Sequence, residues 1–356
     1  MNNNYKWDEA LLGEGGESDF SSSEDMQLPE EEQARALEFN EYLSDSIESI
    51  MQAQVEDTIE LPSISRIDVD KLLTKFAKNF IKELRESVLG GKLNRGLALL
   101  YHALSGAKDR EDEIRMEYFE VAAAIELFQN SMLIHDDIID KDKRRRGRAA
   151  SWTKIGVEKA ILLGDLYLMI ADMTFYDAIL KLREKEAISD DAFDSCRFIW
   201  DSMKRDVIVG QVIDVDFSNT PITNLKNKRT QNKMIEMNSL TDVLKTASYT
   251  TLAPFLLGKV IGKNIDLAEI EDIEVESSVL EGVMYQMSND QDDFGKDLRQ
   301  GHISGFVVML FNSFGDNAEF MEKIFELADK QESITDKDVH DFEDFIHELE
   351  VLEDKE

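Results

Sequence analysis

The stretch Ala122–Arg148 constrains this chain most: an apolar helical run ends in clustered aspartates, and an arginine cluster follows. Asp136 and Asp140 lie about 40° apart on a helical wheel, so they share one face, with Asp137 beside them. Carboxylates this close repel each other unless a cation lies between them. Mg²⁺ binds through one or two carboxylates together with substrate phosphates. The arginines at 144–146 are suitable partners for the remaining charge of a polyphosphate.

The spacing of these aspartates is not specific by itself, because Asp190, Asp191 and Asp194 repeat it. The second copy follows a charged stretch, and no arginine cluster comes after it. We interpret it as the solvated start of a helix, where acidic side chains interact favourably with the helix dipole. The sequence around Asp136, rather than the motif alone, therefore indicates a functional site.

Composition excludes several classes of function. The chain has 40 basic and 74 acidic residues and a net charge of −34, so nucleic acid and anionic membranes would repel it. The single cysteine, Cys196, cannot form an internal disulfide and fits a reducing compartment. No apolar run approaches the ~18 residues of a membrane span, and the acidic N-terminus is unlike a signal peptide. We expect a cytoplasmic protein without a nucleic-acid partner or a transmembrane segment.

Only four prolines, with abundant leucine, isoleucine, methionine, lysine and glutamate, favour helices. We predict an all-α protein with an acidic, partly disordered extension over residues 1–66 and a helical domain over residues 67–356. The segment 157–182 is apolar on every side, which predicts a helix in the middle of a bundle. Helices are expected over residues 69–88, 97–104, 114–140, 157–182, 191–217, 228–254, 266–293, 303–328 and 336–352.

Two further groups of polar residues border these helices. Asn289, Asp290 and Asp293 end an apolar helix about 150 residues after the first aspartates. If both helices point the same way in a bundle, the two acidic clusters would face each other across a cavity. Gly90-Gly91 precedes a helix whose first turn carries Lys92 and Arg95, which is a potential anion site. Cations at this end oppose the helix dipole, so we expect an anion to compensate them.

With these motifs the chain resembles the trans-isoprenyl (polyprenyl) diphosphate synthases over roughly residues 68–330. The resemblance implies an isoprenoid-synthase helical bundle around a deep central cavity, and a homodimer. Five motifs follow in the family's order: GGKxxR at 90–95, the aspartate-rich motif at 136–140 with His135 before it, RRG at 145–147, GQxxD at 210–214 and KT at 245–246.

The resemblance also implies a reaction, the Mg²⁺-dependent condensation of isopentenyl diphosphate with an allylic diphosphate. A carbocation formed from the allylic substrate survives only where water is excluded, which is the reason for an apolar cavity. The resemblance assigns three Mg²⁺ ions to the active site, with Asp136, Asp140, Asn289, Asp290 and Asp293 as their ligands, and it places Asp137 among the catalytic acids.

The same resemblance divides the remaining site residues between the two substrates. It assigns the allylic diphosphate to Arg145 and Lys245, and isopentenyl diphosphate to Lys92, Arg95, Gln129 and Arg146, with Gln211 and Lys296 as further substrate-binding residues. Thr246 and Gln286 would place hydroxyl and carbonyl dipoles near the allylic cation.

Three positions depart from the family pattern. Gln129 stands where many members have histidine, and its amide can donate the same hydrogen bond. His302 replaces a usual lysine. Asn289 replaces aspartate, and with Asp293 and Asp297 it forms an i, i+4, i+8 series like the metal motif of terpene cyclases.

Alternatives therefore remain: a related class I isoprenoid enzyme, either terpene cyclase-like or a peptide prenyltransferase, or a non-catalytic regulatory subunit of a prenyl synthase. The GGKxxR site argues against a cyclase, which has no second diphosphate to hold.

The helix before Asp136 is expected to set the length of the product. Met132 lies about 40° from Asp136 on the wheel, Phe128 about 80° away and one turn deeper, and Ser131 on the far side of an ideal helix. The resemblance nevertheless points to the position of Ser131, which a bulky aromatic residue occupies in family members that make short products. Because serine is small and Met132 is flexible, we expect Phe128 to be the side chain that blocks the growing prenyl chain. This predicts geranylgeranyl diphosphate or a somewhat longer product.

Overall fold

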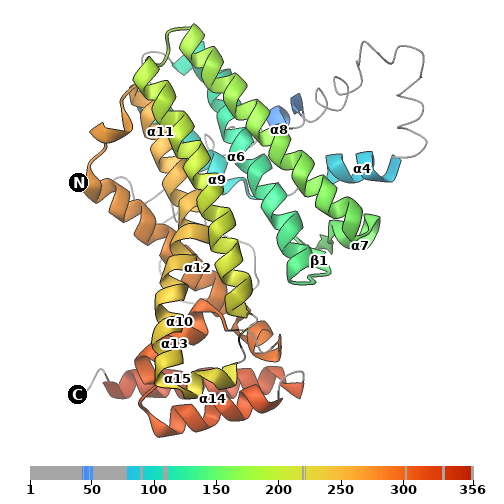
Figure 1. Ribbon diagram of the computed structural model, residues 1–356, viewed down its shortest axis with the longest axis vertical. Helices are drawn as coiled ribbons and strands as arrows, with labels where there is room; N and C mark the ends of the chain where they lie inside the picture. Colours follow the sequence, from blue (N-terminus) through green and yellow to red (C-terminus); the bar gives the residue numbers. More distant parts are fainter. Residues whose placement is uncertain are drawn as a thin grey trace, which may run out of the picture. The chain divides into compact units, whose positions relative to one another are not determined.

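The computed structural model describes residues 42, 44–47, 49–50, 78–88, 91–106, 111–218, 220, 222–300, 303–330 and 333–353. Almost all of them are helical (Figure 1), which confirms the predicted fold class. The predicted N-terminal extension, residues 1–66, lies outside the described residues except for a few positions between 42 and 50. No helix in these ranges is long and apolar enough to cross a membrane.

The elements follow one another as α4 (Lys78–Glu86), α5 (Asn94–Gly106), α6 (Glu111–Ile139), β1 (Arg144–Arg145), β2 (Arg148–Ala149), α7 (Ser151–Ile155), α8 (Val157–Glu184), α9 (Asp190–Ser218), η1 (Ile222–Lys226), α10 (Lys228–Thr241), η2 (Asp242–Leu252), α11 (Ala253–Lys263), η3 (Leu267–Glu269), α12 (Asp272–Gln300), α13 (Gly305–Phe314), α14 (Ala318–Lys330) and α15 (Asp336–Glu353). The chain forms two compact units, residues 1–199 with 254–270 and residues 200–253 with 271–356. Each unit is described separately below.

The first unit is built around α6, which packs along α8 on one side and contacts α5 on another. Its apolar residues from Val121 to Phe128 are completely buried. His135, just before the aspartates, reaches α8, where its Nε2 lies 3.2 Å from the Ile161 carbonyl oxygen and 3.5 Å from Asp165. This packing fixes the end of α6 and therefore the position of the first aspartate cluster.

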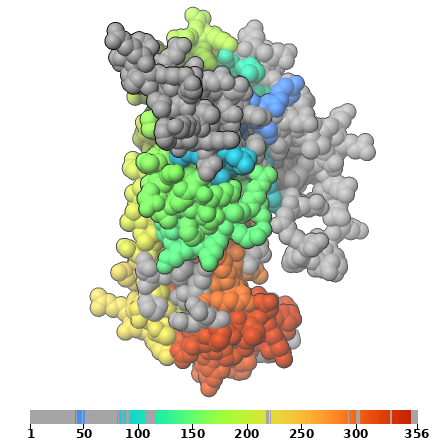
Figure 2. All heavy atoms as spheres, turned by 90° about the vertical axis from the view of Figure 1, so that its right-hand side faces the viewer, coloured from blue at the N-terminus to red at the C-terminus, as the bar shows by residue number. Residues whose placement is uncertain are grey.

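Helix α8 buries one face against α6 and exposes the opposite face, although that face is apolar. Leu162, Met169, Met173 and Leu180 are 60%, 61%, 48% and 38% exposed and lie in one line along the helix. The prediction that this helix lies in the middle of a bundle is therefore wrong for the single chain. The sequence could not distinguish a side that packs inside the chain from an apolar side left open. Figure 2 shows α7 and the first part of α8, in green, on the face toward the viewer.

The second unit has an aromatic core formed by α12, α13, α14 and α15. Phe294, Phe311, Phe320 and Phe342 are buried and in contact through their rings. The predicted helix over residues 303–328 is divided into α13 and α14, because Asn317 accepts hydrogen bonds from the first-turn N–H groups of Glu319 and Phe320 and so begins a new helix.

Helix η2 is a π-helix, and it carries the KT motif between α10 and α11. The predicted helix end at Pro254 is wrong, because the chain continues directly into α11. Pro254 is the second residue of α11, and in the first turn of a helix a missing N–H breaks no helical hydrogen bond. Helix α12 packs along η2, so the motif lies beside the helix that carries the second acidic cluster.

Candidate active site

The first aspartate cluster lies where α6 ends. Asp136 and Asp140 are partly exposed, while Asp137 is almost completely buried. Arg145 binds Asp137 through both Nη2 and Nε, at 2.6 and 2.7 Å from Oδ1. Burial raises the pKa of Asp137 despite this arginine, since loss of solvent outweighs the ion pair. Asp137 thus holds Arg145 in place and leaves Asp136 and Asp140 as the accessible acids of the cluster.

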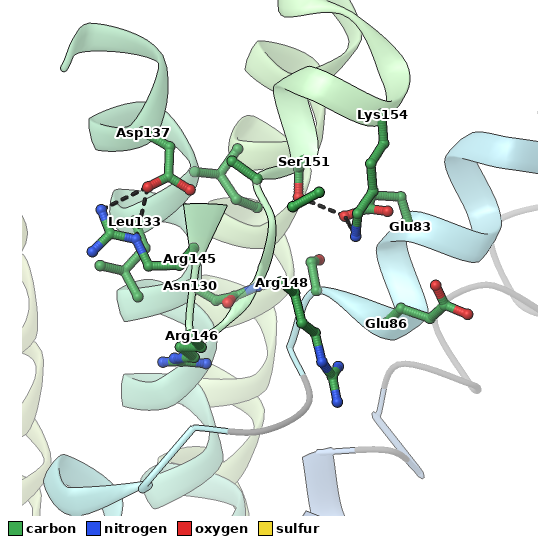
Figure 3. Close-up of a pocket in the computed structure, with 14 residues that line it drawn as sticks. Glu83, Glu86, Asn130, Leu133, Asp137, Arg145, Arg146, Arg148, Ser151 and Lys154 are labelled. Atoms are coloured by element: carbon green, nitrogen blue, oxygen red, sulfur yellow. Dashed lines mark hydrogen bonds and ion pairs between the residues drawn. The ribbon is translucent and has the colours of Figure 1, made fainter. Parts of the chain in front are cut away.

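A tight hairpin separates the arginines that follow. Arg144 pairs with Ala149 and Arg145 with Arg148, and the turn residues Arg146 and Gly147 have φ of 50° and 72°. Positive φ at both positions is typical of a two-residue type I′ turn, in which asparagine, aspartate or glycine usually occupies the position that Arg146 has here. In Figure 3 Arg145 points to Asp137, whereas Arg146 points away from that pair. The sequence did not predict this hairpin, since its two-residue strands are too short to show alternation.

Arg146 lies over Gly91, immediately before α5. A β-carbon at position 91 would lie 2.8 Å from the guanidinium of Arg146, so only glycine leaves this guanidinium where it is. Arg146 is exposed, whereas Arg95, in the first turn of α5, is buried. The charges of both arginines act on the same carboxylate, Glu126. Lys92 is exposed beside Gly91, and Gln129 is partly exposed one turn beyond Glu126 on α6. The charges of Arg95 and Arg146 therefore both reach the carboxylate at the start of α5.

Sequence reasoning missed Glu126. Its side chain is 4% exposed, and its Oε1 accepts the backbone N–H of Gly96 at 2.8 Å. Burial raises the pKa of Glu126, while Arg95, the Gly96 N–H and Arg146 act in the opposite direction. The available signal was a single acid inside the apolar run AAAIELF, where a buried carboxylate needs a partner.

A small pocket of about 40 Å³ lies behind the hairpin, between α4, α6 and α7 (Figure 3). Its charged groups are largely paired: buried Glu83 accepts the Ser151 hydroxyl at 2.7 Å and Lys154 Nζ at 3.1 Å. The pocket has room for water. These contacts attach α7 to α4 and support the hairpin from behind. The lining comprises Glu83, Glu86, Ser87, Asn130, Leu133, Ile134, Asp137, Arg145, Arg146, Arg148, Ala149, Ala150, Ser151 and Lys154.

In the second unit, the GQxxD and KT motifs form one structure. Lys245 Nζ lies 2.5 Å from Asp214 Oδ2, and both side chains are about a quarter exposed. At Gly210 a β-carbon would lie 2.4 Å from the backbone nitrogen of Lys245, so glycine allows α9 to approach η2 closely. Gln211 is partly exposed next to this contact.

A chain of hydrogen bonds joins the KT motif to the second acidic cluster. Thr246 donates its hydroxyl to Gln286 Oε1 at 2.8 Å, and Gln286 Nε2 donates to Asp290 Oδ1 at 2.6 Å. Burial raises the pKa of Asp290 to about 6, although the Gln286 amide and the Gly305 N–H donate to it. Asn289 and Asp293 are exposed, so these two residues form the accessible side of the cluster.

Further residues surround this cluster. Lys296 is partly exposed, and His302 lies outside the described residues. Burial raises the pKa of Asp297 to about 7. Asp242, which the sequence analysis did not single out, is buried beside Asp290 and Asp214 and accepts a hydrogen bond from Asn238. Burial, reinforced by these two acids, raises the pKa of Asp242 to about 7.

The donor atoms in both units are carboxylate and amide oxygens, which suit Mg²⁺. Among the described residues, no three acidic, histidine or cysteine side chains are grouped so that they could hold an ion by themselves. Oxygen donors of this kind fit Mg²⁺ that is bound through one or two carboxylates per cluster, with substrate phosphates as the other ligands.

Comparison with known proteins identifies the family. The Polyprenyl synthetase family profile matches residues 77–341. The chain belongs to this family. The matched range of this polyprenyl synthetase family member includes both acidic clusters and all the basic residues described above.

Curated relatives include the geranylgeranyl diphosphate synthase of Methanosarcina mazei, 29% identical over 201 residues that cover 53% of this chain and 56% of the relative. The farnesyl pyrophosphate synthase of Candida albicans is 27% identical over 232 residues, which cover 63% of this chain and 62% of the relative. The chain thus matches less than two thirds of the length of either protein.

Solved structures of the same fold include the farnesyl diphosphate synthase of T. brucei, with a TM-score of 0.68 and 20% identity over 89% of this chain and 88% of that one. The geranylgeranyl pyrophosphate synthase of Corynebacterium glutamicum, solved with isoprenyl diphosphate and magnesium, has a TM-score of 0.66 and 23% identity over 89% and 87%. At these identities the likeness establishes the fold alone.

Proposed function

We propose that this polyprenyl synthetase family member is a Mg²⁺-dependent prenyltransferase that condenses isopentenyl diphosphate with an allylic diphosphate. One observation carries the proposal: the consecutive residues Arg145 and Arg146 are directed apart, one to Asp137 and the other to Gly91. One hairpin thereby presents two separate basic groups. A condensation of two diphosphates needs two such groups, whereas a cyclase needs only one.

On the first unit, Arg145 binds oxygens of the allylic diphosphate beside Asp136 and Asp140, while Lys92, Arg95 and Arg146 hold isopentenyl diphosphate. Gln129 donates a further hydrogen bond to the second substrate. Three Mg²⁺ ions, when bound, neutralise the departing diphosphate. Held in place by these groups, the two substrates react as if in one molecule.

On the second unit, Lys245 also binds diphosphate oxygens, with Gln211 and Lys296 as further polar contacts. The allylic C–O bond breaks with both electrons going to the diphosphate, and the double bond of isopentenyl diphosphate attacks the resulting cation. Loss of a proton to the released diphosphate completes the reaction. The dipoles of Thr246 and Gln286, which their mutual hydrogen bond fixes, stabilise the cation. The single buried Cys196 is consistent with a cytoplasmic location.

The decisive experiment is one incubation of purified protein with Mg²⁺, isopentenyl diphosphate and allylic diphosphates of increasing length. An elongated prenyl diphosphate supports the proposal. A cyclic hydrocarbon formed from the allylic substrate alone would indicate a terpene cyclase instead. A protein that is inactive alone but changes the rate of an active prenyl synthase would be a regulatory subunit.

We also propose that the protein is a homodimer through the open face of α8. Leu162 and Met169, at 60% and 61% exposed, are the most exposed residues of this face, and burying such residues against a second copy removes apolar surface from water. The double variant Leu162→Lys/Met169→Lys should therefore sediment as a monomer. Met116→Lys alters a residue on α6 that is 63% exposed and should leave the dimer intact. A wild-type protein that sediments as a monomer contradicts this proposal.

Product length gives a further prediction. Phe128 and Ser131 are completely buried in the first unit, whereas Met132 is partly exposed on the side of Asp136. Ser131→Phe fills the small position and should shorten the main product by at least one five-carbon unit, while Phe128→Ala should lengthen it. Chromatography of the dephosphorylated products measures both changes. If neither substitution changes the product distribution, the stop lies on another helix.

A further inference from the structure

Thr246 departs from the hydrogen-bonding pattern of its neighbours on α10 and η2. Three other hydroxyl side chains of this stretch donate to the backbone carbonyl oxygen four residues earlier, at 2.6–3.1 Å, namely those of Ser239, Thr241 and Ser248. Such bonds to the preceding turn are common for serine and threonine inside helices. Thr246 instead donates to Gln286 Oε1 on α12, at 2.8 Å. The direction of its hydroxyl group therefore depends on a side chain of another helix.

A glycine brings α12 close enough for this hydrogen bond. Gly282 is buried and lies one turn before Gln286 on α12. A β-carbon at position 282 would lie 2.5 Å from the Cα atom of Ala247 in η2, so the two helices can approach this closely only with glycine there. Ala247 directly follows Thr246 in the chain. The close approach therefore places the Gln286 side chain within reach of the Thr246 hydroxyl group.

Asp290 binds the other end of the Gln286 amide. Gln286 Nε2 donates to Asp290 Oδ1 at 2.6 Å. The second carboxylate oxygen, Oδ2, faces the start of α13, where a β-carbon at Gly305 would lie 2.5 Å from it. Both oxygens of Asp290 thus lie against groups of the protein, whereas the side chains of Asn289 and Asp293 are exposed. Asp290 is therefore the member of the second acidic cluster that is built into the packing of α12.

The carboxylate of Asp290 fixes the direction of both hydrogen bonds. An ionised carboxylate only accepts hydrogen bonds, so the NH₂ group of the Gln286 amide must point to it. The amide oxygen is then the atom that faces Thr246. Because this oxygen also only accepts, the Thr246 hydroxyl group must donate its single proton to it. The hydroxyl lone pairs are left on the side away from Gln286, and an oxygen lone pair stabilises a cation in its vicinity, whereas an O–H proton would repel it.

We propose that Asp290 is a positioning residue that acts through Gln286 and does not bind Mg²⁺. Its carboxylate orients the Gln286 amide, and through it the Thr246 hydroxyl group, so that lone pairs face the allylic cation. This inference rests on the proposed function. The cation exists only after the allylic C–O bond has broken, so the orientation matters in the transition state and not in the bound substrates. Loss of the orientation should therefore lower kcat and leave KM unchanged.

Asp290→Asn tests this role, because an amide at position 290 can turn either its oxygen or its NH₂ group to Gln286. We expect kcat to fall at least about tenfold, with the KM of each substrate changed less than about threefold. A kcat within about threefold of wild type, or a loss confined to KM, overturns the proposal.

The matched control is Asp242→Asn. Asp242 is a second buried acid of this unit, 6% exposed, and it accepts a hydrogen bond from Asn238 at 2.8 Å instead of from Gln286. The variant removes a neighbouring charge but leaves the Gln286 amide in place, so kcat should change less than about threefold. If both variants lose kcat equally, the local charge is responsible and not the orientation, and the proposal is wrong.

The double variant Gln286→Glu/Asp290→Asn moves the carboxylate from position 290 to position 286. The new carboxylate accepts hydrogen bonds both from the Thr246 hydroxyl group and from the new amide, so the direction of each bond is restored. We expect the double variant to recover kcat to within about threefold of wild type. It also serves as the test variant if Asp290→Asn does not fold. A double variant that is as slow as Asp290→Asn contradicts the proposal.

Calorimetric titration of Mg²⁺ into protein with inorganic diphosphate gives a measurement that does not depend on turnover. Asp290→Asn should bind Mg²⁺ within about threefold of wild type, whereas Asp293→Asn should bind it at least about tenfold more weakly. Equal weakening in both variants makes Asp290 a metal ligand and overturns the proposal. Wild-type protein that forms no elongated product contradicts the proposed function. An active wild type with an unchanged Asp290→Asn variant contradicts only the role of Asp290.

Discussion

Asp136→Asn should reduce turnover at least about a hundredfold while changing the free energy of unfolding by less than about 0.5 kcal/mol. Asp136 is partly exposed and next to Asp137, and Arg145 Nη2 is 3.9 Å away, too far for a hydrogen bond. Removing its charge weakens this long contact with Arg145, and it relieves repulsion between neighbouring carboxylates. In the proposed reaction the same charge is needed to bind Mg²⁺ with the allylic diphosphate. Steady-state kinetics and thermal unfolding measure the two effects separately.

Two other aspartates provide controls for this prediction. Asp190, in the second copy of the spacing, has a side chain that is 90% exposed, and Asp190→Asn should leave the rate unchanged. Asp137→Asn should instead lower the free energy of unfolding by about 3 kcal/mol, because it leaves Arg145 without its buried partner. Equal losses of rate at Asp136 and Asp190 would mean that the first cluster is not the catalytic one.

The helices were predictable because apolar periodicity records which residues pack inside the chain. The ranges predicted for the helices carrying both acidic clusters agree with α6 and α12 to within several residues at each end. The roles predicted for Arg95 and Arg146 remain predictions, although the charges of both residues act on one carboxylate, Glu126. Local sequence is therefore sufficient to predict a helix when the pattern of neighbouring residues determines which side of it is buried.

Other features depend on contacts between distant segments, and these left little trace in the sequence. Glu126 is a single acid in an apolar part of α6, and its partner Gly96 lies on α5. Asp242 is buried at the start of η2, and its partner Asn238 lies one turn earlier, in α10. The direction of Arg146 follows from positive φ at two successive residues, which no periodicity reveals. The prediction that α8 lies in the middle of a bundle fails because apolar composition alone does not distinguish a helix face that is buried within the chain from one that stays exposed on it.

The contact between Lys245 and Asp214 supports a second large effect. Lys245→Met removes the charge while keeping most of the side chain, and it should reduce kcat at least about a hundredfold, because a cation that faces developing diphosphate charge is lost. The ion pair is 2.5 Å long but a quarter exposed, so its loss should change the free energy of unfolding by about 1 kcal/mol or less. Single-turnover kinetics with saturating substrates measure the chemical step.

Asp214→Asn is the matched variant from the other side of this pair. It leaves the cation of Lys245 present but no longer restrained, so the rate should fall by roughly tenfold, less than for Lys245→Met. Lys245→Arg keeps a cation of different shape and should recover part of the rate. If Lys245→Met lowers Tm strongly and kcat only slightly, Lys245 stabilises the packing of α9 on η2 and does not bind diphosphate. A rate that depends on the charge at position 245, with stability unchanged, places Lys245 in the chemistry of the leaving group.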